Sequence, residues 1–226
     1  PAVKPKLPSA SDIEYIIRSF EMAERPVCLI GGGIRSADAK DEFAAFVENN
    51  DIPVIYAPSA VDIYPSTKKL SVGCVSSLGG SREANFCVQN SDMLLVLGCR
   101  MPSMVTGGKH DRFAHSAKKI IVDIDKDEAN KGNIHYDRII DADVKAVLRE
   151  LNRASIKKTN LEWVHKCVHW KNVLSLTNIS YDCSRPVDLY NLAGTLSKAL
   201  KDDSIVVTDA GFEELIIPSN MHFKET

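Results

Sequence analysis

The stretch PVCLIGGGIRS, residues 26–36, combines a buried strand, a glycine turn and a helix start. Residues 27–30 form a short continuous apolar run, which is typical of a strand covered on both faces. Gly31 to Gly33 then allow a turn that a side chain would forbid, and they leave amide groups uncovered. Ser36 is expected to cap the next helix, which carries apolar residues on one face. Strand, glycine turn and helix start in this order can receive a phosphate or pyrophosphate.

The glycine turn leaves two interpretations open. Ser36 stands where a dinucleotide-binding fingerprint has its third glycine, and Asp51 lies before the second strand, at the wrong end to hold a ribose. We therefore discount an ordinary NAD site. The glycines either receive a phosphate or only allow a tight turn between strand and helix.

Bulk composition narrows the class of protein. The 226 residues have room for one large domain, or for one domain and part of another. A formal net charge of -2 argues against nucleic acid or a membrane as the main partner. The six cysteines form no C-x-x-C pair, which suits buried thiols in a reducing cytoplasm. Pro1 in place of Met predicts a cut or processed end.

Strands alternate with helices along the first 154 residues, which predicts an α/β fold with a doubly wound, mostly parallel, Rossmann-like sheet. A capping box of Ser11 and Glu14 is expected to start the first helix. Residues 57–80 show no strong periodicity. The expected strands are 27–30, 52–56, 93–97, 119–124 and 139–140, and further helices are expected from Ser81, Asp125 and Asp143.

The chain is expected to divide into three parts. Residues 1–154 make the Rossmann-like domain with its N-terminal linker and helix, and 155–184 make a linker with a helix. Residues 185–226 read as the truncated start of a second α/β domain. In that part Pro186 is expected to open a helix and residues 205–208 to form a strand.

Ligands of a doubly wound sheet bind beyond the carboxyl ends of its strands. Those ends carry two glycine turns, an arginine able to fork onto a phosphate, and carboxylates able to hold a ribose. The candidate residues are Gly31, Gly32, Gly33, Gly79, Gly80, Arg100 and Asp123. The alternative is that Asp123 and Asp125 only cap a helix and that Arg100 pairs with one of them. We identify no catalytic set and no metal ligands.

Five segments carry a family resemblance: AERPVCLIGGG at 23–33, IPVIYAPSA at 52–60, SDMLLVLGCR at 91–100, KKIIVDIDKDE at 118–128 and IIDADVKAVL at 139–148. In order and spacing they resemble the central domain of thiamine diphosphate-dependent enzymes of the acetolactate synthase large-subunit type. IVVTDAG at 205–211 resembles the start of the family's third domain, where Gly211 would face the diphosphate. Glu213 and Glu214 follow it, and their negative charges would repel a bound diphosphate.

The resemblance implies a three-domain enzyme of which this chain holds the middle and a piece of the last domain. The complete enzyme would use thiamine diphosphate and Mg²⁺ as a lyase or transferase acting on a 2-oxo acid, and would form a homodimer or homotetramer. The family's activating glutamate and magnesium-binding motif are missing from this sequence. We therefore expect the segment by itself to be inactive.

The resemblance also implies a nucleotide site, because the central domain binds FAD in acetolactate synthases and ADP or nothing in some relatives. Carried over by position, its lining would be Gly32, Gly33, Gly79, Gly80, Arg100, Asp123 and Asp143. Ser77–Gly80 and Arg100–Ser103 depart from the family's glycine-rich and aspartate-rich loops. These departures favour a flavin-poor relative whose central domain mainly braces its neighbours. A free-standing flavin- or nucleotide-binding module of the electron-transfer flavoprotein kind is the alternative.

Overall fold

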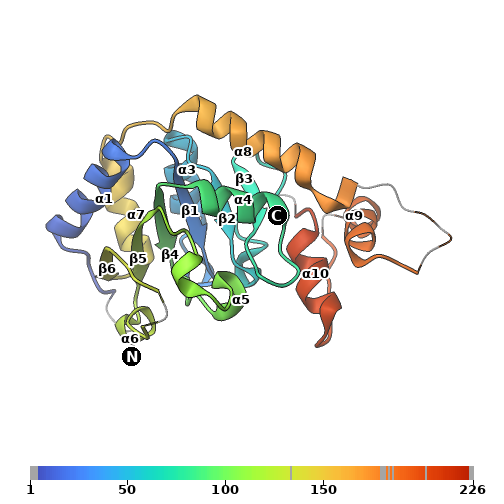
Figure 1. Cartoon of the computed structure of the whole chain (residues 1–226). Coiled ribbons are helices and arrows are strands. Elements are labelled where there is room, and N and C mark those ends of the chain that lie inside the picture. Colours follow the sequence, from blue (N-terminus) through green and yellow to red (C-terminus); the bar gives the residue numbers. More distant parts are fainter. Residues whose placement is uncertain are drawn as a thin grey trace.

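The computed structural model of the chain describes residues 5–132, 134–178, 182, 184, 186–201 and 203–223. At its centre lies a parallel six-stranded sheet in the order β3-β2-β1-β4-β5-β6, with helices on both faces (Figure 1). The predicted doubly wound α/β fold is confirmed. The strands are β1 Pro26–Ile30, β2 Val54–Tyr56, β3 Ser71–Cys74, β4 Met93–Leu97, β5 Lys118–Asp123 and β6 Arg138–Asp141.

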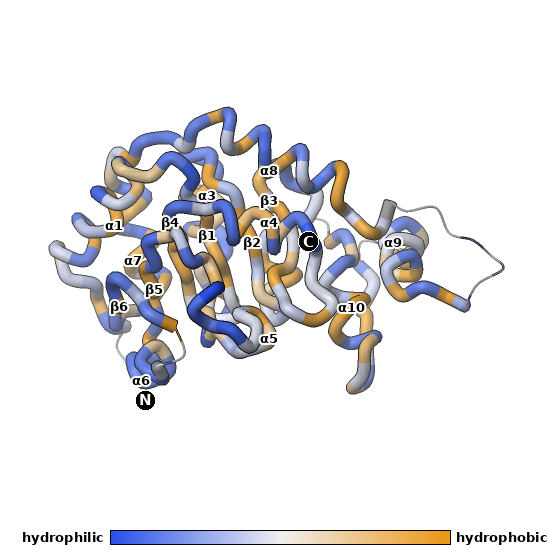
Figure 2. Tube along the Cα trace, viewed as in Figure 1, coloured by the Kyte–Doolittle hydropathy of each residue, from blue (hydrophilic) through white to orange (hydrophobic). Residues whose placement is uncertain are grey.

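Alternating residues of each central strand pack into two separate hydrophobic cores, one on each face of the sheet. In β1, Cys28 and Ile30 join the core beneath α1, α3 and α7, whereas Val27 and Leu29 join the core beneath α4 and α8. Because both faces are covered, the strand is apolar throughout, and Figure 2 shows this as hydrophobic colour along the inner strands. The helices are α1 Ala10–Met22, α2 Gly33–Ser36, α3 Lys40–Asn49, α4 Arg82–Asn90, α5 Ser103–Thr106, α6 Lys126–Ala129, α7 Val144–Arg153 and α8 Leu161–Leu174.

The strand order reverses between β1 and β4, which are neighbours in the sheet. Ile30 at the end of β1 pairs with Leu97 of β4 on one side and with Tyr56 of β2 on the other. The carboxyl ends of these strands therefore lie level. The loops that leave them diverge, and this opens a crevice at the point of reversal.

Short polar side chains start most helices as the sequence predicts. Ser81, Asp125 and Asp143 accept hydrogen bonds from the first-turn amides of α4, α6 and α7. The prediction for α1 was wrong by two residues. Ser9 and Asp12 form the capping box, because this pair satisfies both free amides at the helix start and Ser11 lies within the first turn.

The prediction for the helix after the glycine turn was wrong, and one strand was not predicted. Ser36 ends the one-turn helix α2, and α3 begins only at Lys40 after Ala39, which contributes no side-chain cap. The segment without periodicity contains a short 3₁₀ turn, Pro58–Ala60, and the edge strand β3. Strand β3 is only four residues long and contains Gly73, so neither its length nor its pattern marks it in the sequence.

The C-terminal part packs against the Rossmann-like domain along α8. The Trp163 indole donates to the carbonyl of Pro26 at 3.1 Å, and the Cys167 sulfur lies 3.5 Å from that of Cys87 on α4. After a 3₁₀ turn at Leu176–Asn178, helices α9 Leu189–Ala199 and α10 Phe212–Asn220 pack on each other, and α10 also touches β3. Figure 1 shows α8 spanning the molecule and leading to these two helices.

Two expectations for this C-terminal part were wrong. Asp188 caps α9 and Leu189 begins it, so Pro186 lies before the helix. Residues 205–208 form no strand in the described structure, and the side chains of Ile205 and Val207 are almost fully exposed. A strand needs neighbours for its backbone groups, and the described residues place none beside this segment.

Candidate functional site

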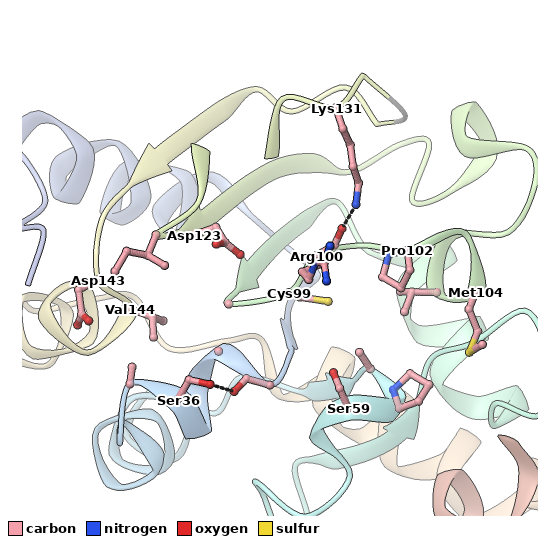
Figure 3. Close-up of a pocket in the computed structure, with 18 residues that line it drawn as sticks. Ser36, Ser59, Cys99, Arg100, Pro102, Met104, Asp123, Lys131, Asp143 and Val144 are labelled. Atoms are coloured by element: carbon pink, nitrogen blue, oxygen red, sulfur yellow. Dashed lines mark hydrogen bonds between the residues drawn. The ribbon is translucent and has the colours of Figure 1, made fainter. Parts of the chain in front are cut away.

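A cavity of about 810 Å³ lies at the carboxyl ends of β1, β4 and β5, where the strand order reverses (Figure 3). Its size is in the range of small-molecule sites. The loops after these strands and the starts of α2, α5 and α7 form its walls. Its lining includes Gly32, Gly33, Ser36, Ser59, Gly98, Cys99, Arg100, Met104, Val105, Asp123, Ile124, Lys131, Asp143 and Val144.

The glycine turn has a packing role in two of its three residues. A Cβ on Gly31 would lie 2.3 Å from the carbonyl oxygen of Gly98, and a Cβ on Gly33 would lie 2.6 Å from the Cα of Gly98. The turn thus presses against the loop after β4, which explains the glycines without a ligand. At Gly32 the nearest atom to such a Cβ is the Ser59 oxygen at 3.5 Å, an ordinary contact. Gly32 lines the cavity, and among the described residues no acceptor pairs with its amide.

A cluster of three charged side chains stands on one rim of the cavity. The Arg100 guanidinium donates to Glu128 at 2.8 Å, and the Lys131 ammonium donates to the second Glu128 oxygen at 3.0 Å. These two cations lower the pKa of Glu128 to about 2, with Arg100 the larger cause. Arg100 pairs with Glu128 and with neither Asp123 nor Asp125. Its side chain is 76% exposed, so it can turn toward an anion in the cavity.

Two carboxylates also line the cavity, at the end of β5 and at the start of α7. Asp123 ends β5, and burial, aided by the nearby Asp125 and Glu128, raises its pKa. One of its oxygens accepts from the Asp125 amide at 2.9 Å. Asp143 caps α7 through the Ala146 amide at 3.0 Å. Figure 3 shows Asp123 between Asp143 and Arg100, with Asp143 farther from Arg100.

The rest of the wall is mainly apolar. Met104 and Val105 come from α5 and were missed by the sequence reasoning, whereas Ile124, which is 55% exposed, lies in the expected strand end after β5. Lys131 also reaches the rim and donates to the Arg100 carbonyl. No periodic pattern in the sequence identifies these residues as part of the cavity wall, because they belong to short segments whose position depends on the folded sheet. An apolar wall with a few charged groups suits a ligand that has a flat ring and an anionic end.

The structure does not bring the second glycine turn to this cavity. A Cβ on Gly79 would lie 2.8 Å from the Leu215 carbonyl of α10, and the Gly79 carbonyl accepts from Asn220 at 2.7 Å. A Cβ on Gly80 would lie 2.5 Å from the Ser76 amide nitrogen. Gly79 therefore serves close packing against α10, and Gly80 serves close packing within its own loop. The spacing of the sequence could not separate this role from ligand binding.

Gly211 is also far along the chain from the cavity lining and starts α10. Its φ of 157° is a backbone conformation that residues with a side chain rarely adopt, and a Cβ there would lie 2.5 Å from a Glu213 carboxylate oxygen. A carboxylate thus lies close to Gly211, which disfavours an anion at this position. The described residues around Asp209 and Gly211 do not fit a thiamine diphosphate site.

The described residues form neither a metal site nor a membrane span. Among the described residues, no group of three or more His, Cys, Asp or Glu side chains could hold a metal ion. No described helix combines the length and the apolar character that a membrane span requires.

Comparison with known proteins gives consistent matches. The family model described as "Thiamine pyrophosphate enzyme, central domain" matches residues 13–151. The probable acetolactate synthase large subunit of Methanocaldococcus jannaschii is 31% identical over 226 residues, covering 95% of this chain and 37% of that protein. The acetolactate synthase large subunit of Corynebacterium glutamicum is 33% identical over 215 residues, covering 92% of this chain and 33% of that protein. The chain thus spans about a third of the length of these curated relatives.

Proposed function

The chain belongs to the thiamine pyrophosphate enzyme family as its central domain, of the acetolactate synthase type, and on that premise we propose that it is a non-catalytic, nucleotide-binding brace within a larger enzyme. The brace is the Rossmann-like domain, residues 1–154, with a helical linker at 155–184. Residues 185–226 would begin the next domain. The complete protein would decarboxylate a 2-oxo acid with thiamine diphosphate and Mg²⁺ and work as a homo-oligomer in the cytoplasm.

The observation that carries the binding proposal is the set of charges around the cavity at the strand tips. Arg100 would hold a diphosphate, and the Gly32 amide would donate to it. Asp123 at the end of β5, or Asp143 at the start of α7, would accept the hydroxyls of a ribose. Met104, Val105 and Ile124 would cover an adenine ring. The ligand class is therefore an adenosine diphosphate group, whether free or as part of FAD.

The same cavity supports the non-catalytic role. Its described lining holds no serine or cysteine beside a histidine base, and burial raises the pKa of the Cys99 thiol to about 11. This thiol is therefore protonated and unreactive near neutral pH. A bound flavin would add a redox-active ring and ADP would add none, so the chain's own residues bind and orient the ligand only.

The misfit at Gly211 supports inactivity of the segment by itself. Glu213 lies where the anionic end of thiamine diphosphate would bind, and α10 presents two acidic residues in its first turn. The measurement is release of carbon dioxide from pyruvate by the purified chain with thiamine diphosphate and Mg²⁺. We expect none, and turnover by this chain would overturn the brace proposal.

The binding proposal is tested by calorimetry with ADP and with FAD on the purified chain. We expect ADP to bind, and Arg100→Ala to weaken its affinity by about 10- to 100-fold, the value of a hydrogen bond to a charged group. Glu128→Gln should tighten binding because it frees Arg100. Arg18→Ala, which removes an exposed arginine of α1, is the matched control and should bind as the unaltered chain does.

Two outcomes would change this assignment. Absence of binding by both nucleotides at millimolar concentration, or equal affinity in Arg100→Ala, would refute the site. A yellow preparation that binds FAD while the complete protein acts on no 2-oxo acid would favour a free-standing flavin module instead.

A further inference from the structure

A second and smaller cavity of about 120 Å³ lies where the C-terminal helices meet the Rossmann-like domain. Four elements contribute to its wall. Strand β3 provides Ser71, the first turn of α4 provides Glu83, α8 provides Lys171 and α10 provides Ser219. It is independent of the nucleotide site and of the function proposed above.

Three side-chain oxygens in this wall are buried without a hydrogen-bond partner. They are Ser71 Oγ, Glu83 Oε2 and Ser219 Oγ, from residues that are 1%, 6% and 2% exposed. Within the described part of the chain only one other buried side-chain oxygen, that of Thr159, shares this condition. The Tyr56 hydroxyl is close to Ser71, the Ser81 hydroxyl to Glu83 and the Cys74 thiol to Ser219, but none of these pairs has hydrogen-bond geometry. Unpaired buried oxygens are costly, and three in one cavity point to a guest that pairs with them.

The charges of the wall decide the chemical class of the guest. The Lys171 ammonium donates to the carbonyls of Ser66 at 2.6 Å and Lys68 at 3.0 Å, which leaves one of its three hydrogens for the cavity. Lys171 and Glu83 influence each other electrostatically but are too far apart for a direct ion pair. The wall thus supplies its own cation, which disfavours a metal ion, and its own carboxyl, which disfavours an anion. The ligand that suits this wall is therefore a neutral molecule that both donates and accepts hydrogen bonds.

We propose that this cavity is an internal hydration site, in which a cluster of water molecules bridges Glu83 to Lys171 and Ser219 and so attaches α10 to the central sheet. The volume holds about four waters at about 30 Å³ each. Each water would pair with groups from more than one element, so the cluster connects four elements that make few direct polar contacts here. Apart from the cluster, α10 is held by its apolar side against α9 and by the hydrogen bond from Asn220 to the Gly79 carbonyl.

A crystal structure of the chain at high resolution is the direct test. We expect ordered water within hydrogen-bond distance of Ser71 Oγ, Glu83 Oε2 and Ser219 Oγ. Density for an ion or an organic molecule, side chains that have turned to pair with one another, or a cavity without ordered solvent would each overturn the proposal.

Amide hydrogen exchange in α10 tests the attachment. Glu83→Leu puts an apolar side chain of similar size in place of the carboxyl and so removes a main hydrogen-bond partner of the water, so exchange in residues 212–220 should rise at least tenfold. Glu83→Gln keeps the shape and the hydrogen bonds, and exchange should stay within threefold of the unaltered chain. Thr159→Val, which removes the unpaired oxygen outside this cavity, is the control and should change nothing in α10. Equal exchange in Glu83→Leu and the unaltered chain would refute the attachment.

Discussion

Replacing Gly31 by alanine separates the packing role of the glycine turn from a role in ligand binding. The new Cβ would lie 2.3 Å from the Gly98 carbonyl oxygen and 2.5 Å from the Cys99 Cα, and both are backbone atoms that cannot rotate away. Overpacking of this kind costs about 3 kcal/mol, and the stiffer unfolded chain returns under about 1 kcal/mol. The net loss of about 2 kcal/mol lowers the Tm by about 4–8 °C for a chain of this size.

Gly32→Ala is the matched variant in the same turn. Its Cβ would make an ordinary contact of 3.5 Å with the Ser59 oxygen. With φ at -60° and ψ at -16°, the backbone of Gly32 is one that alanine adopts freely. We expect its stability to rise by up to about 1 kcal/mol. Thermal unfolding followed by circular dichroism, without nucleotide, measures both variants, and equal Tm values would refute the packing explanation.

The remaining predictions concern charges and thiols. Burial raises the pKa of Glu83 from 4.5 to about 7, so the folded chain holds this proton more tightly than the unfolded chain, and stability falls as pH rises through that window. In urea unfolding, the free energy of unfolding of Glu83→Gln should lack this fall, which amounts to at most about 3 kcal/mol. Parallel pH profiles of the two proteins would be evidence against a raised pKa at Glu83. Arg100→Ala should raise the pKa of Glu128 from about 2 toward 4.5 in a carbon-13 NMR titration, and an unchanged value would mean that Arg100 does not govern it. In a Cys183→Ser background, the buried Cys28, Cys74, Cys87, Cys99 and Cys167 should not react with Ellman's reagent until the protein unfolds. Rapid labelling of the native protein would show that these thiols are accessible.

The strands of the central sheet were predictable because their environment is encoded locally. Strand β4 spans Met93–Leu97, as predicted, since five consecutive apolar residues before a glycine leave few other structures. The caps Ser81, Asp125 and Asp143 were found for the same reason, because a short polar side chain satisfies amides only two or three residues away. The family resemblance rested on these same segments.

The errors fall where a structure depends on distant neighbours. Strand β3 exists because it can pair with the exposed edge of β2, and its own four residues carry no strand pattern. Residues 205–208 have a strand pattern but no described partner strand. Gly79 and Gly80 follow the pattern of a phosphate-binding turn, yet Gly79 packs against α10 and Gly80 packs against Ser76.

The sequence alone determined the fold class, the strand tips at which a ligand would bind, and the family, because each depends on the order of residues within a short window. Only the tertiary structure decided which residues share a site. It directed Arg100 to Glu128, separated the two glycine turns, and gathered Ser71, Glu83 and Ser219 around one cavity. Contacts between residues far apart in the chain depend on how whole elements pack, and no local pattern records that.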